Sequence, residues 1–199
     1  MGGPQNVTNA TLMVRVKKGD RDAFATLVQS HQNSVLNFIW HFMGDRTEAE
    51  DLAQEAFLRV WESAATYKPR AKFSTWLYRI VTNLCINRHR FLKIRNLFSI
   101  SSSPKYKPDM MDILESEAGV NPVTPEDRLL KAEQYHQIFN ALDTLPPAQK
   151  LAIVLKINQG LSYSEISQIM GRSVSAVDAL LIRAKKNLRK KMGVKKLLY

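Results

Sequence analysis

The chain has 199 residues, of which 45% are hydrophobic and 24% charged, a composition that indicates a folded protein and excludes a disordered one. Its formal net charge of +11 indicates an anionic partner, either nucleic acid or an anionic membrane surface, although a basic protein without such a partner would have the same balance. The single cysteine, Cys85, excludes an internal disulfide and a cysteine metal cluster. No targeting segment or membrane-spanning apolar run is visible, so we expect a cytoplasmic protein.

Charge divides the chain into three segments. Residues 1–98 have a net charge of +6, residues 99–127 of −4, and residues 128–199 of +9. The middle segment is rich in Ser and Pro and lacks a sustained hydrophobic period, which predicts a flexible linker. In both flanks apolar residues recur at spacings of three and four. The predicted fold is therefore all-α, with two small helical domains at residues 10–98 and 128–199 joined by a linker at 99–127.

The first flank predicts three helices in chain order. One covers about residues 20–43. A second begins with a capping box, in which Thr47 and Glu50 satisfy each other's backbone N–H groups, and runs to about residue 65. A third covers about residues 74–90.

The second of these helices has more apolar surface than a small bundle needs. One stripe, from Leu52 to Val60, suits a core, but a separate stripe at helical spacing mixes carboxylates with a Leu and a Trp. Such a mixture is typical of a protein-binding surface; the alternative is that Leu58 and Trp61 simply cover the first helix. The candidate interface residues are Asp51, Gln54, Glu55, Leu58 and Trp61.

The third helix and the loop before it have the features of a nucleic-acid surface. Residues 63–108 contain ten Lys or Arg and no acidic residue, which favours contact with phosphates. Asn and Arg on the outer side of the helix can bond to base edges, and aromatics between the loop cations can stack on unpaired bases. The alternative is a solvated basic loop whose aromatics belong to the core. The candidate residues are Tyr67, Lys68, Arg70, Lys72 and Phe73 in the loop, and Arg79, Asn83, Asn87 and Arg90 in the helix.

The second flank ends in a predicted helix-turn-helix. Ser162 and Glu165 form a capping box, Gly171 supplies the turn, and Ser173 caps a last helix whose inner side begins with Val174. Such a helix presents its first residues to the major groove, although an ordinary helical hairpin has the same pattern. After Asp178 the chain has eight Lys or Arg and no acid, which favours phosphate contacts. The residues expected at the groove are Arg172, Ser173, Ser175, Ala176, and Asp178 or Ala179.

With these features in place, the chain resembles the extracytoplasmic-function (ECF) sigma factors. Residues 22–40, 47–63 and 73–90 look like successive parts of the family's conserved region 2, and residues 142–192 look like its region 4. The resemblance implies a promoter-reading subunit of RNA polymerase, made of a region 2 helical bundle and a region 4 helix-turn-helix. It implies no catalytic residue, metal, cofactor or small-molecule substrate.

The resemblance also implies partners and roles for the candidate residues. The Asp51 to Trp61 stripe would dock on the clamp helices of the polymerase β′ subunit, and the β subunit would be a further contact. The loop at 67–73, with Asn83, Asn87 and Arg88, would open and read the −10 promoter element. Residues 172–183, with Lys186, would read the −35 element. The acidic linker would run toward the active-site cleft, and an anti-sigma protein would hold the chain inactive.

Two positions depart from the family pattern, and two other function classes compete. Asp178 and Leu180 stand where family recognition helices often carry basic residues, so we expect a different −35 sequence or a readout through backbone geometry. A conventional repressor or activator would bind DNA tightly alone, usually as a dimer on a palindrome, whereas a sigma factor would bind weakly until core polymerase is added. An enzyme is disfavoured because the four histidines have no ligand spacing, and no phosphate loop or nucleophile elbow is present.

Overall fold

The computed structural model describes residues 8–69, 71–98, 124, 133 and 137–192, and every regular element among them is helical. The all-α prediction is therefore confirmed, while the predicted linker at 99–127 lies outside the described residues except for Thr124. In the described part of the chain, no helix combines the length and hydropathy that a membrane span needs. The elements are α1 (Asn9–Val16), α2 (Arg21–Met43), α3 (Arg46–Ser63), the 3-10 turn η1 (Ala64–Thr66), α4 (Phe73–Phe98), α7 (Pro147–Asn158), α8 (Tyr163–Met170) and α9 (Val174–Met192), with a further helical stretch at 137–143.

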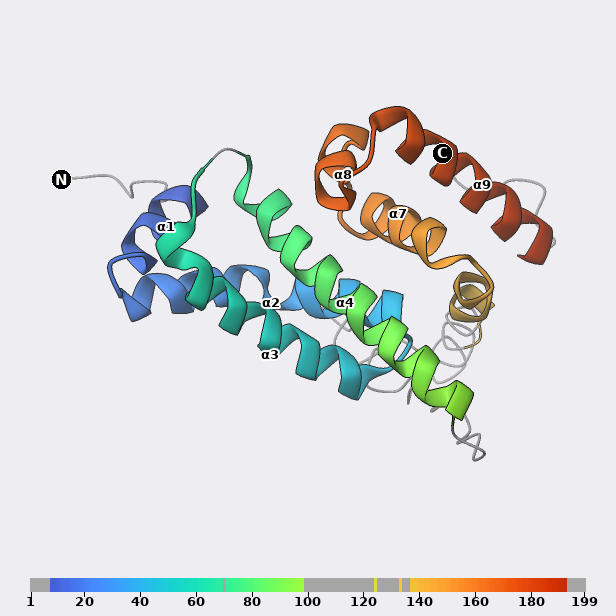
Figure 1. Cartoon of the computed structure of the whole chain (residues 1–199), viewed down its shortest axis with the longest axis horizontal. Helices are drawn as coiled ribbons and strands as arrows, with labels where there is room; N and C mark the ends of the chain where they lie inside the picture. The colour runs from blue at the N-terminus through green and yellow to red at the C-terminus, as the bar shows by residue number, and fades with distance from the viewer. Residues whose placement is uncertain (1–7, 70, 99–123, 125–132, 134–136, 193–199) are drawn as a thin grey trace.

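The N-terminal helices α1 to α4 form one packed group (Figure 1). The helices α2, α3 and α4 all contact one another, and α1, which the sequence analysis did not predict, packs on α2. Because apolar residues recur at helical spacing on each, the group closes over one core. Its most deeply buried side chains include Met13, Leu27, Val35, Phe38, Phe42, Val60 and Leu77.

The predicted capping box at Thr47 and Glu50 is wrong. Helix α2 ends at Gly44, whose φ of 75° is the left-handed conformation that glycine tolerates, and the next residue already caps α3. The Asp45 carboxylate accepts a hydrogen bond of 2.9 Å from the backbone N–H of Glu48. Since Asp45 fills the cap position, Thr47 lies inside the first turn, and Glu50 instead pairs with Arg46.

The C-terminal helices follow the local signals in the sequence closely. Ser162 and Glu165 form the predicted capping box at the start of α8, and Gly171 ends this helix with a φ of 62°. The Ser173 hydroxyl accepts from the N–H of Ala176 at 3.2 Å and so caps α9. Val174 was predicted to face inward, but it is 47% exposed because the apolar stripe of α9 begins only at Val177. The helices α7, α8 and α9 contact one another around a second set of buried apolar side chains.

The two groups of helices pack against each other. Helix α8 contacts α4, and α7 contacts α2, so the C-terminal group covers one side of the N-terminal group (Figure 1). This arrangement leaves α3 on the far side of the N-terminal group. The candidate surfaces therefore lie on the outer side of α3, on the outer side of α4 and at the start of α9.

Candidate protein and nucleic-acid interfaces

Two apolar residues of the α3 stripe have different surroundings. The Trp61 ring is half-buried and packs edge-on against Phe24 of α2, with 5.1 Å between ring centroids. Leu58, in contrast, is 62% exposed. Trp61 therefore covers the first long helix, as the alternative interpretation held, whereas Leu58 is an unpacked apolar side chain at the centre of the stripe.

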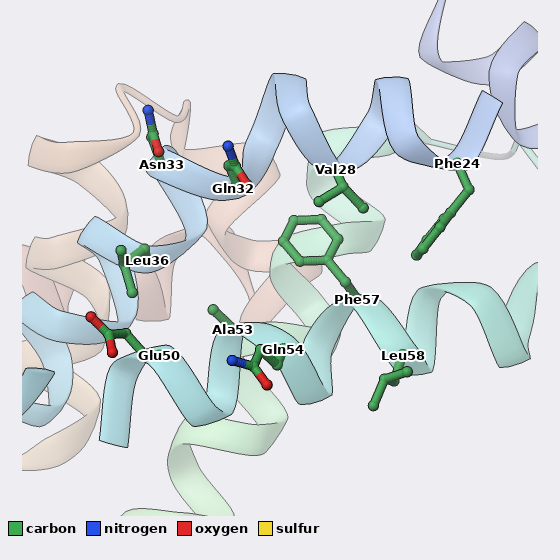
Figure 2. Close-up of a pocket in the computed structure, with 10 residues that line it drawn as sticks. All are labelled: Phe24, Val28, Gln32, Asn33, Leu36, Glu50, Ala53, Gln54, Phe57 and Leu58. Carbon is green, nitrogen blue, oxygen red and sulfur yellow. The ribbon is translucent and has the colours of Figure 1, made fainter. Parts of the chain in front are cut away.

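An apolar groove of about 500 Å³ lies between α2 and α3, next to Leu58. Figure 2 shows side chains of the two helices facing each other across it, with Val28 of α2 beside the Phe57 ring of α3. Most of the lining is apolar, while amide and carboxylate groups lie along its sides. Such a mixture suits the apolar side of a partner helix. The lining residues are Phe24, Val28, Gln32, Asn33, Leu36, Glu50, Ala53, Gln54, Phe57 and Leu58.

The carboxylates of the stripe lie on the opposite flank of α3. Asp51 and Glu55 line a second groove, between α3 and α4, together with Asn87 and Arg88. The Glu55 carboxylate pairs with Arg59 at 2.6 Å on the same helix. The structure thus divides the five predicted residues. Gln54 and Leu58 face the α2–α3 groove, Asp51 and Glu55 face the α3–α4 groove, and Trp61 packs on α2. Both grooves open beside the exposed side of α3.

Arg88 makes a two-pronged ion pair across the α3–α4 groove. Its guanidinium donates to both carboxylate oxygens of Glu48, at 2.6 and 2.8 Å, and lies 5.8 Å from the centroid of the Phe91 ring. The Glu48 carboxylate keeps the pKa of Arg88 above its ordinary value, mainly through this hydrogen bond. In this structure Arg88 therefore joins α4 to α3, and it is not presented to DNA as a free cation.

The two aromatic residues of the predicted DNA loop are buried. Tyr67 and Phe73 join Trp76 and His31 in a cluster, which we call the aromatic cluster, with ring centroids 4.9 to 6.5 Å apart. Partial burial lowers the pKa of His31, whose Nε2 lies 2.9 Å from the amide nitrogen of Asn9 on α1. The packing agrees with the alternative in which these aromatics belong to the core, because neither ring offers a free face to a base.

The polar residues predicted on α4 lie on its outer surface. Arg79, Asn83, Asn87 and Arg90 are all exposed, so one side of the helix presents donors and acceptors that can reach base edges or phosphates. Before the helix, Lys68 is exposed and Arg70 lies outside the described residues. Lys72 is also exposed, yet its ammonium pairs with Glu165 of α8 at 2.9 Å.

The start of α9 presents small polar groups and few cations. Arg172, Ser173 and Ser175 are exposed, whereas the other three predicted groove residues, Ala176, Asp178 and Ala179, are half-buried. Farther along, Arg183 and Lys186 are exposed. The Arg183 guanidinium donates to the Ala179 carbonyl at 3.0 Å. On the turn and the exposed side of α9, these polar groups lie beside the exposed apolar side chains of Val174 and Ile182.

Some residues that shape these surfaces were not predicted. Glu48 fixes Arg88, and Gln159 at the end of α7 bonds to the N-terminal helices. Their partners lie 40 and 125 residues away, so no local spacing in the sequence could reveal them. Among the described residues, no three His, Cys, Asp or Glu come together as metal ligands.

Comparison with known proteins covers both groups of helices. The Sigma-70 region 2 model matches residues 27–93, and the Sigma-70 region 4 model matches residues 135–188. The chain is 35% identical to the ECF RNA polymerase sigma factor SigW of Bacillus subtilis over 89% of its own length and 93% of that protein. It is 30% identical to the ECF RNA polymerase sigma-E factor of Haemophilus influenzae over 94% and 97% of the two chains.

Two solved structures share the fold. CnrH, in complex with the cytosolic domain of CnrY, has a TM-score of 0.68 at 21% identity and covers 96% of this chain and 100% of CnrH. RpoE of Bartonella quintana, in complex with the anti-sigma factor NepR, has a TM-score of 0.63 at 18% identity, covering 87% and 98%. The helical arrangement, the two family matches and the two relatives agree, and the chain belongs to the ECF family of RNA polymerase sigma factors.

Proposed function

We propose that this sigma factor binds core polymerase through the exposed side of α3. The observation that carries this proposal is Leu58, an apolar side chain 62% exposed between a mostly apolar groove and a groove lined by carboxylates and arginines. An apolar centre with fixed charges around it is the usual composition of a binding hot spot, and the charges set the register of a basic partner. The partner surface is the β′ subunit, with further contacts to the β subunit. Asp51, Gln54, Glu55 and Leu58 form this interface, together with the part of the half-buried Trp61 ring that Phe24 leaves uncovered.

Promoter DNA binds on two other surfaces. The exposed residues of α4, Arg79, Asn83, Asn87 and Arg90, read the −10 element, with Lys68, Arg70 and Lys72 on the phosphates before it. The turn at Arg172 and the start of α9 read the −35 element, and the cations farther along α9 hold the backbone. The aromatic cluster and Arg88 hold α4 in place and so stabilise the −10 surface. The domains are residues 10–98 and 128–199, and the linker is 99–127.

We infer that the chain is regulated by a protein partner, acts without catalysis and works in the cytoplasm. An anti-sigma protein restrains this chain, by analogy with RpoE bound to NepR. The chain contributes no catalytic group and needs no cofactor, because its work is binding and positioning. It acts in the cytoplasm, where RNA polymerase and the chromosome are found.

Run-off transcription with purified core polymerase tests the proposal. Adding the wild-type chain is expected to direct initiation at specific sites, and Leu58→Ala is expected to weaken core binding about tenfold, since truncation of a hot-spot side chain costs about 1–2 kcal/mol. Val14→Ala, which truncates another exposed apolar residue on α1, serves as the matched control and should bind normally. If Leu58→Ala binds core polymerase as tightly as the wild-type chain does, α3 is not part of the interface. If the wild-type chain does not direct initiation at specific sites, the sigma function is overturned.

A further inference from the structure

One side of α9 differs in character from the basic side next to it. Ser175, Asp178 and Ile182 follow one another at spacings of three and four residues, so they share a side of the helix. Asp178 is the only acidic residue of α9, which spans Val174–Met192, and Ile182 is 59% exposed. The side formed by Ser175, Asp178 and Ile182, which we call the reading stripe, therefore offers no cation to DNA.

The adjacent side of α9 is basic. Arg183, Lys186 and Lys190 recur at the same spacings, and all three are exposed, so they can contact phosphates. The Asp178 carboxylate has no ion-pair partner among the residues that the structure describes, so no contact within that part of the chain neutralises its charge. A carboxylate repels a phosphate. The reading stripe therefore suits the bases of the major groove, and the basic side suits the backbone.

The two larger residues of the reading stripe suit different bases. A carboxylate only accepts hydrogen bonds, and in the major groove cytosine presents an amino donor at N4. Guanine presents two acceptors there, and adenine places its N7 acceptor beside its amino group, so Asp178 favours cytosine. The Ile182 side chain has no polar atom, and the apolar group that bases present in this groove is the 5-methyl group of thymine. Ile182 therefore favours thymine.

We propose that Asp178 and Ile182 determine which −35 sequence the chain reads, with Asp178 selecting cytosine and Ile182 selecting thymine. This assignment rests on the proposed function and names the bases that the −35 surface recognises. Ser175 and Ala179 are small, so the start of α9 can approach the base edges closely. Four residues span about 6 Å along a helix axis, and base pairs are about 3.4 Å apart, so the two selected bases lie about two base pairs from each other.

Selection from a promoter library tests the cytosine assignment with the complete holoenzyme. A promoter that the wild-type chain transcribes is randomised at its −35 positions and bound by core polymerase together with the full chain. The wild-type chain should enrich cytosine at one position, and Asp178→Asn should change this preference to adenine, because an amide matches both N6 and N7 of adenine. Asp178→Ala should lose the cytosine preference, about five- to tenfold, without weaker binding to the other bases.

Replacing thymine with deoxyuridine tests the second assignment, because deoxyuridine lacks only the 5-methyl group. The library should show thymine enriched about two positions from the cytosine, and the wild-type chain should bind this thymine about threefold more tightly than deoxyuridine, the effect of burying one methyl group. Ile182→Ala should reduce the ratio to about one. Ile157→Ala on α7 truncates another isoleucine, 69% exposed, and as the matched control should keep the threefold ratio.

The outcomes separate this assignment from the proposed function. An unchanged base preference in Asp178→Asn would overturn the assignment of cytosine, and an unchanged ratio of thymine to deoxyuridine in Ile182→Ala would overturn that of thymine. Both results leave the transcription directed by the wild-type chain intact. If the wild-type chain with core polymerase transcribes no promoter, the proposed function itself is overturned.

Discussion

The surface assigned to the −10 element and the surface assigned to the −35 element are held in place by different kinds of contact. On α4, Arg88 is fixed by Glu48, 40 residues earlier in the chain, and Phe73 packs on His31 of α2. At the start of α9, the turn depends on Ser162, Glu165, Gly171 and Ser173, which lie within twelve residues of one another. The first surface depends on tertiary packing and the second on local backbone geometry.

This difference predicts how each surface responds to substitution. A change in the core beneath α4 should alter the −10 surface from a distance and lower the stability strongly, because buried aromatic packing contributes several kcal/mol. A change in one cap near α9 removes a single local contact and should have a small effect. Three experiments test this contrast.

The largest effect is expected from Phe73→Ala. The ring is buried in the aromatic cluster, so its removal leaves a cavity and should lower the free energy of unfolding by about 3–5 kcal/mol. Urea denaturation followed by circular dichroism measures the loss. Phe73→Leu, which keeps most of the volume, should cost less than about 1.5 kcal/mol and retain promoter opening. Normal stability of Phe73→Ala with lost promoter opening would assign the ring to DNA instead.

A smaller effect is expected from the ion pair that joins α3 to α4. A double-mutant cycle with Glu48→Ala and Arg88→Ala should give a coupling energy of about 1 kcal/mol, because the pair is two-pronged and Glu48 is largely shielded from water. The exposed pair of Arg46 and Glu50 on α3 provides the control, with an expected coupling of about 0.3–0.5 kcal/mol. Equal coupling energies for the two pairs would show that the ion pair across the groove stabilises the fold no more than an exposed surface pair does.

The same contrast explains which features could be predicted from the sequence. The capping box at Ser162, the turn at Gly171 and the cap at Ser173 are local signals, and all three were predicted correctly. The all-α fold followed from hydrophobic periodicity, which needs no tertiary information. At the start of α3 the sequence contains two possible caps, Asp45 and Thr47. Asp45 is the actual cap because it directly follows Gly44, whose left-handed conformation ends α2.

Tertiary features could not be predicted in the same way. The spacing of Tyr67 and Phe73 among cations is equally compatible with stacking on bases and with burial, and only the position of His31 and Trp76 decides between them. The pairing of Arg88 likewise depends on how α3 packs on α4. The surface positions of α4 were predictable because the opposite side of the helix is apolar.

The smallest effect is expected from the pH dependence of the capping box at α8. Hydrogen bonds from the Ser162 hydroxyl and backbone, together with the nearby Lys72, lower the pKa of Glu165 from 4.5 to about 2. Because the folded-state pKa lies below the unfolded one, the carboxylate stabilises the fold above about pH 4.5, and this contribution falls as the pH drops toward 2. Partial exposure and solvent screening limit this contribution to about 1 kcal/mol.

The Glu165→Gln variant tests this pH dependence, because glutamine keeps the capping box but cannot titrate. As the pH falls from 4.5 to 2, the free energy of unfolding of Glu165→Gln relative to that of the wild-type chain should rise by about 1 kcal/mol. A constant difference between the two chains in urea denaturation over that range would mean that the charge of Glu165 adds nothing to the cap.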